Sequence, residues 1–170
     1  MFPPARGAAL RGVRMKYHHF GSGRYVLRLD PGDEVIASIV SFAQERGLTA
    51  GWVSGIGSLD HAVLGFLDPK DKVYLKRTFD ERMEIGSLNG NIGVAQDGTC
   101  FVHVHAVLSP RELLAYTGHL HEARVGVVVE AIVTAMHGKL VRAVDPATGF
   151  ARLVLPGEKG APAAEGASGC

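Results

Sequence analysis

The stretch Phe101-Val-His-Val-His-Ala-Val-Leu-Ser109 alternates small apolar residues (Val102, Val104, Ala106) with two histidines in its centre. Successive side chains of a β-strand project to opposite faces of a sheet, so this period of two predicts a strand. His103 and His105 would then point to one face, while the apolar residues beside them point to the other. We therefore expect the apolar face of this strand to pack against the core and the histidine face to point away from it.

Further segments with strand character lie on both sides of this stretch, separated by turns rich in glycine or aspartate. They are Arg24–Leu29, Gly51–Ser54, His61–Leu67, Val73–Phe79, Met83–Val94, Val125–Thr134, Leu140–Val144 and Phe150–Leu155. Ser54-Gly-Ile-Gly-Ser58 is expected to form a tight connection between two strands. It lacks the lysine of a P-loop and no helix follows it, which disfavours phosphate binding.

One long helix is predicted from the Asp-Pro-Gly-Asp turn at residues 30–33 to about Arg46. Asp33 can cap its first turn, and Gly47 stands where a left-handed residue ends a helix. The apolar residues recur at intervals of three and four, as one buried helix face requires: Val35, Ile36, Ile39, Val40 and Ala43. A second, short helical turn is expected at Pro110–Leu114, with Ser109 as its cap.

Many strands and one main helix predict an α+β fold, a largely antiparallel sheet with the helix packed on it. Val125–Val133 is apolar on both faces. We therefore expect it to be a central strand, covered either by the helix or by a neighbouring subunit.

The chain has 170 residues, 46% of them hydrophobic, which is the size of one domain with its own core. We expect a flexible basic tail at residues 1–14, a domain at 15–156 and a disordered tail at 157–170. No apolar run is long enough for a membrane span, and residues 1–14 carry no secretory signal. With two cysteines and no disulfide framework, a cytoplasmic location is expected.

The formal net charge of +1 is far from the strongly basic balance of a free-standing nucleic-acid binder. Basic residues do precede the first acid, Asp30, and could contact phosphate. A solvated tail is the more frequent meaning of such a stretch.

A second pair of histidines spaced by two follows in Gly118-His-Leu-His121. Imidazoles two apart on a strand can reach one metal ion, and His119 or His121 could supply a third ligand. Three protein ligands would leave a fourth position on zinc open for water. The alternative is that these histidines are hydrogen-bonded and bind no metal, and the spacing supports the two about equally. The other four histidines, His18, His19, His61 and His137, are expected either at the surface or hydrogen-bonded to partners.

Glu130 lies inside the apolar run Val127-Val-Val-Glu-Ala-Ile-Val133, where a carboxylate is costly to bury without a partner. It could accept a hydrogen bond from a metal-bound imidazole and so orient it. Pairing with an arginine such as Arg142, or with a neighbouring chain, is the more frequent arrangement.

Four motifs, in this order along residues 15–155, resemble the PPC domain family, which plants and prokaryotes share. They are Gly51-Trp-Val-Ser-Gly-Ile-Gly-Ser-Leu59, Met83-Glu-Ile-Gly-Ser-Leu-Asn-Gly-Asn-Ile92, Phe101-Val-His-Val-His-Ala-Val-Leu-Ser109 and Gly118-His-Leu120. Members are often described as candidate DNA-binding proteins with a PD1-like motif. The usual Gly-Gly-His-Leu of the family appears here as Thr117-Gly-His-Leu120.

The resemblance implies a compact α+β domain that assembles as a homotrimer. It also implies a site for zinc, or another divalent transition metal, with His103, His105 and His119 as ligands. His121 is an additional candidate ligand, and Glu130 a candidate for the carboxylate behind them. Plant members carry AT-hooks built on Arg-Gly-Arg-Pro, and no such motif occurs in this sequence.

Two functions follow from these expectations. The first is a homotrimeric, zinc-binding interaction module with a DNA-associated role. The alternative is a metal-dependent enzyme that uses a three-histidine zinc site with an open water position.

Overall fold

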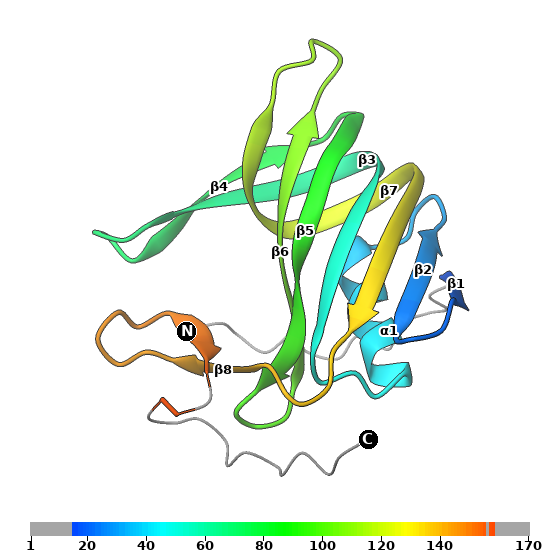
Figure 1. The fold of residues 1–170 in the computed structure, drawn as a ribbon. Helices are drawn as coiled ribbons and strands as arrows, with labels where there is room; N and C mark the ends of the chain where they lie inside the picture. The colour runs from blue at the N-terminus through cyan, green and yellow to red at the C-terminus, as the bar shows by residue number, and fades with distance from the viewer. Residues whose placement is uncertain (1–14, 156, 159–170) are drawn as a thin grey trace.

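A computed structural model describes residues 15–155 and 157–158 (Figure 1). In this part of the chain, nine strands and one helix make up the regular structure. They are β1 (Lys16–His19), β2 (Arg24–Leu29), α1 (Val35–Glu45), β3 (Gly51–Asp68), β4 (Val73–Phe79), β5 (Met83–Ala95), β6 (Cys100–Ser109), β7 (Tyr116–Ala135), β8 (Val141–Val144) and β9 (Ala151–Val154). The predicted α+β class is confirmed. The predicted tails lie outside the described residues, apart from Gly157 and Glu158.

The sheet is antiparallel throughout except for the pairing of β5 with β8. Strand β3 pairs with β5 and β7, and β6 pairs with the same two strands, so these four strands close a ring. β2 and β1 extend the sheet beyond β7, and β4 forms a hairpin with β3 that projects to one side (Figure 1). The histidine-bearing strands β6 and β7 therefore lie side by side.

β3 runs without interruption through the glycine-rich stretch at residues 54–58, so the predicted tight connection is wrong. The register against β5 and β7 shifts there instead, which marks a β-bulge. Gly57 has a φ of +150°, and a Cβ on it would collide with the backbone of Val128 and Val129. Glycine at this position allows β3 to lie close to β7 at the bulge.

Helix α1 packs its apolar face against β6 and β7. Its N-cap is Glu34, not Asp33, because Oε2 of Glu34 accepts a hydrogen bond from the Ala37 N–H at 2.6 Å. The other oxygen of Glu34 accepts from the Ala123 N–H of β7 at 3.0 Å, which ties the helix start to the sheet. Gly47, with a φ of +63°, ends the helix as the sequence predicts.

The core lies between α1 and the inner face of the sheet. Its largest fully buried side chains include Phe42, Leu27, Leu29, Ile39 and Leu59. Within β7, Val125, Val129, Ala131 and Val133 are buried, whereas Val127 and Ile132 are exposed. Within the described chain, the helix side of this strand is covered and the other side carries exposed apolar residues.

The short helix predicted at Pro110–Leu114 does not form. The segment is a turn closed by a hydrogen bond from the Leu113 N–H to the Pro110 carbonyl at 3.0 Å. Leu113 and Leu114 are exposed, so no apolar helix face meets the core there. None of the helices in the described ranges is long and apolar enough to cross a membrane.

Candidate metal centre

Strand β6 holds His103 and His105 on the same face, as the period of two predicts. The register pairs His103 with Asn91 and His105 with Asn89 of β5. The two rings are nearly perpendicular, with centroids 5.3 Å apart. Val104, the residue between them, is buried in the core on the other side of the strand.

Strand β7 brings the third histidine, because its register places His119 directly opposite His105. The ring of His119 lies 5.0 Å from that of His103 and 5.6 Å from that of His105, centroid to centroid. One ring nitrogen from each of the three lies within 4.8 Å of the others. Thr117, which replaces a glycine of the family pattern, lies in the strand without a positive φ.

Two of the three histidines, His103 and His119, are held in the neutral form at neutral pH. Burial, with the neighbouring charges of Arg142 and His105, lowers the pKa of His103 to about 4. Burial and the charges of the surrounding histidines and Arg142 lower the pKa of His119 to about 3. Neutral imidazole is the form that binds zinc.

The donor set fits a divalent transition metal. Nδ1 of His119 is buried and has no hydrogen-bond partner among the described residues, so this nitrogen is available to bind a metal ion. Two nitrogens bound to tetrahedral zinc at about 2.0–2.1 Å lie about 3.3 Å apart. The three ring nitrogens, which lie within 4.8 Å of one another, would move closer together to bind one ion.

His121 is not part of this group, although its ring lies 4.6 Å from that of His119. The pairing of β3 with β7 jumps from Val63–Glu122 to Leu64–Leu120, so His121 is the extra residue of a bulge. Its Nε2 lies beside Gly65, and its ring packs edge-on against Tyr74. The bulge turns His121 toward a neighbouring pocket of about 440 Å³ with Lys72 and Lys76.

Glu130 lies in the opposite half of β7, away from the three histidines. It is exposed and stands opposite Arg28 on one side and Ile56 on the other. The expectation of a buried carboxylate behind an imidazole is not met, because Glu130 belongs to the outer face of the sheet, where water solvates its charge.

The remaining four histidines lie apart from the cluster. His18 and His19 are exposed on β1, and His137 follows the end of β7. Nδ1 of His61 pairs with Oδ1 of Asp80 at 2.5 Å. His18, His19 and His137 thus lie at the surface and the partly buried His61 is hydrogen-bonded, in agreement with the expectation.

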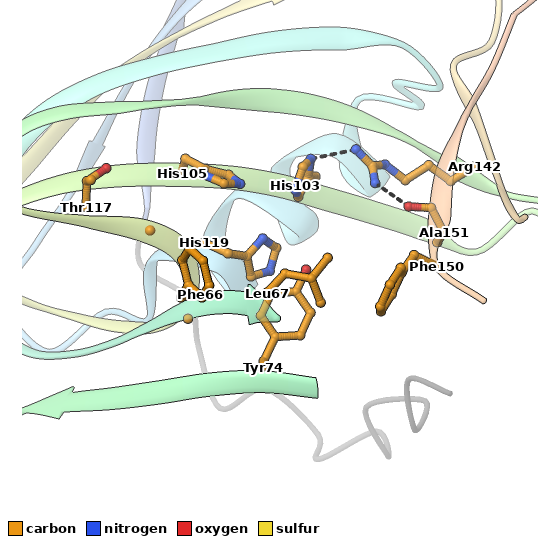
Figure 2. A pocket seen from close by; sticks show the side chains of 12 residues that line it. Phe66, Leu67, Tyr74, His103, His105, Thr117, His119, Arg142, Phe150 and Ala151 are labelled. Atoms are coloured by element: carbon orange, nitrogen blue, oxygen red, sulfur yellow. Dashed lines mark hydrogen bonds between the residues drawn. The ribbon is translucent and has the colours of Figure 1, made fainter. Parts of the chain in front are cut away.

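A cavity of about 530 Å³ lies beside the cluster and includes all three histidines in its wall (Figure 2). Phe66, Leu67 and Tyr74 from the β3–β4 hairpin form one side, and Phe150 from the β8–β9 connection forms another. Arg142 of β8 also lines it, and donates hydrogen bonds to Nδ1 of His103 and to the Ala151 carbonyl. No local pattern in the sequence indicates that these residues face the histidines, since they come from distant hairpins.

Several known proteins are similar to this chain. The bifunctional protein GlmU of Synechococcus sp. strain JA-3-3Ab is 33% identical over 132 residues, which cover 76% of this chain and 20% of that protein. The chain thus spans about a fifth of the length of the curated relatives it matches.

Two solved structures share the fold. A candidate DNA-binding protein from Bacteroides thetaiotaomicron superposes with a TM-score of 0.78 at 28% identity, covering 82% of this chain and 96% of that one. A metal-containing protein from Archaeoglobus fulgidus has a TM-score of 0.73 at 31% identity, covering 86% and 100%. Residues 18–137 match the Plants and Prokaryotes Conserved (PCC) domain, and the chain belongs to that family.

Proposed function

We propose that this PCC domain protein is a homotrimeric, zinc-binding interaction module, with its domain at residues 15–156. The observation that carries the metal site is the convergence of one ring nitrogen from each of three histidines within 4.8 Å. His103, His105 and His119 would each supply one nitrogen. The similar protein from Archaeoglobus fulgidus, which is described as metal-containing, adds support.

Elemental analysis of protein purified without added metal tests this site. We expect about one zinc, or another divalent transition metal, per chain, and its loss in His105→Ala. His61→Ala is the matched control, because His61 pairs with Asp80 outside the cluster. A wild-type protein that holds no metal after zinc soaking and dialysis would contradict the proposal.

An exposed apolar surface supports the trimer. Val26 of β2 stands opposite Ile132 of β7, which in turn stands opposite Ser54 of β3. Trp52 and Ile56 flank Ser54 on the same face of β3. These apolar side chains are 39–58% exposed, and a contiguous surface of this kind is typical of a subunit interface.

Light scattering coupled to size exclusion tests the assembly. We expect a trimer for the wild type and dissociation by Ile132→Lys, because a lysine would be buried in the interface without a partner. Leu75→Lys on β4 is the control, since Leu75 is equally exposed but lies outside this surface. A monomeric wild type at micromolar concentration would contradict the trimer.

A DNA-associated role rests on the similar protein described as a candidate DNA-binding protein and on the basic residues that precede Asp30. Gel shifts at low and physiological salt, with and without residues 1–14, test it. Binding that weakens steeply with salt is expected. The absence of any shift at low salt would remove the role. The cytoplasmic location remains a prediction.

The alternative function, a metal-dependent enzyme, is favoured by the cavity of about 530 Å³ against the cluster. Zinc held by three imidazoles supplies a Lewis acid and lowers the pKa of a water in the fourth position to about 7. Arg142, Tyr74 and Phe150 would bind and orient the substrate in this cavity. A hydrolase screen compares wild type with His105→Ala, and equal rates in the two would exclude metal-dependent hydrolysis.

A further inference from the structure

Arg142 is a half-buried guanidinium that has no acidic partner among the described residues. Nη1 donates to the Ala151 carbonyl at 3.2 Å, Nη2 donates to Nδ1 of His103, and the group lies over the ring of Phe101. Nε is buried and meets no acceptor within the described part of the chain. A buried arginine usually pairs with a carboxylate, because a charge taken out of water needs compensation.

The hydrogen bond from Arg142 to His103 is incompatible with metal binding at His103. A neutral imidazole has one lone pair and one N–H. If a metal binds Nδ1, it takes the lone pair that accepts from Arg142. If a metal binds Nε2, Nδ1 carries the proton and faces the guanidinium with a donor. In either case the metal-bound state leaves Arg142 with two nitrogens, Nε and Nη2, that need a new acceptor.

The described lining of the cavity provides no acid to fill this role. Its polar side chains are the three histidines, Arg142, Thr117 and Tyr74, and the adjoining pocket adds two lysines. The rest of the wall is apolar, with Phe66, Leu67 and Phe150 facing the same space (Figure 2). An anion with an apolar body matches both the charge and the wall.

We propose that this cavity binds a small organic carboxylate, whose oxygens accept hydrogen bonds from Arg142 while its apolar body lies against Tyr74 and Phe150. The proposal rests on the metal site proposed above, since metal binding is what frees Arg142 from His103. A planar carboxylate suits two neighbouring N–H donors of a guanidinium. Inorganic phosphate has similar acceptors but no apolar body, so it is expected to bind more weakly.

Calorimetry of the zinc-loaded protein tests the proposal with benzoate, its neutral isostere benzamide, and inorganic phosphate as probes. We expect benzoate to bind about tenfold or more tightly than benzamide, the effect of a charge-assisted hydrogen bond. Arg142→Gln should abolish this preference, and Arg142→Lys should restore part of it. Arg152→Gln is the matched control, because Arg152 pairs with Asp145 and Glu158 outside the cavity.

Zinc affinity gives a second readout that needs no enzyme activity. Benzoate should tighten zinc binding by the same factor by which zinc tightens benzoate binding, because linkage is reciprocal. Without benzoate, Arg142→Gln should hold zinc at least as tightly as wild type, since a competing donor and a like charge are gone. Circular dichroism checks that each variant is folded, and the wild-type comparison of benzoate with benzamide needs no variant.

The two proposals fail differently. A wild type that binds no zinc contradicts the metal centre itself. A zinc-bound wild type that binds benzoate no better than benzamide, binds phosphate more tightly, or keeps its preference in Arg142→Gln contradicts the carboxylate site alone.

Discussion

The chain contains two histidine pairs with the same spacing, and the structure treats them differently. His103 and His105 lie on a regular part of β6 and both face the cluster. His119 and His121 lie on β7, where one joins the cluster and the other lies beside Gly65 and Tyr74. The difference is the bulge at His121, which breaks the alternation of side chains. Spacing in the sequence places two rings together only where the strand keeps its register.

The largest expected difference between the pairs is in zinc affinity. His119→Ala should lower it more than about 100-fold, because loss of a ligand exceeds the 10–100-fold effect of removing a residue behind a ligand. Competition with a chelator measures it. A loss of less than tenfold would show that His119 does not bind the metal.

The packing of His121 can be disturbed through Gly65. A methyl group added there would meet Nε2 of His121 and the ring of Tyr74. Gly65→Ala should therefore lower the free energy of unfolding by about 1–3 kcal/mol, as overpacking does. Gly86→Ala is the control, because its nearest neighbour would be the Val107 carbonyl at 3.8 Å. Urea unfolding compares the two, and equal stability would contradict the packing described for His121.

Acid should destabilise the metal-free protein, because unfolding allows His103 and His119 to become protonated. Burial lowers the pKa of His103 to about 4 and that of His119 to about 3, from 6.5. The unfolded chain therefore binds protons that the native state does not bind. The free energy of unfolding is highest above about pH 6.5 and decreases as the pH falls toward 3.

Urea unfolding of EDTA-treated protein at several pH values measures this loss. His119→Asn should reduce the pH dependence more than His121→Asn, because burial, together with the charges of the neighbouring histidines and Arg142, lowers the pKa of His119 to about 3. A pH dependence unchanged by His119→Asn would contradict this account.

The smallest expected effect is the change in zinc affinity when His121 is replaced. His121→Asn should change zinc affinity by less than about threefold, since its ring nitrogens lie outside the group within 4.8 Å. A loss comparable to that of His119→Ala would make His121 a ligand and would require the bulge to rearrange.

The sequence predicts those features of the fold and site that depend only on neighbouring residues along the chain. His103 and His105 share a face because β6 is regular, and the helix stops at Gly47 because only a left-handed residue fits there. The positions of His121 and of the long β3 depend on bulges, which are register shifts between paired strands and which a local pattern does not reveal.

The positions of Arg142 and Glu130 depend on the whole fold. Arg142 reaches His103 because β8 pairs with β5, a contact between distant segments. Glu130 looks buried from its apolar neighbours, but its face of β7 is exposed in the described chain. Which face of a strand is covered depends on its partners and not on its own residues.

A short connection joins β6 and β7, the strands that carry the candidate ligands. In contrast, β2 pairs with β7 although most of the chain separates the two strands in the sequence. Closing a long loop costs more conformational entropy than closing a short one, and pairings between distant segments slow folding. We therefore expect the β6–β7 hairpin to form early and the edge beyond β7 to form late. Metal present during folding would then act on the hairpin before the remainder of the sheet is assembled.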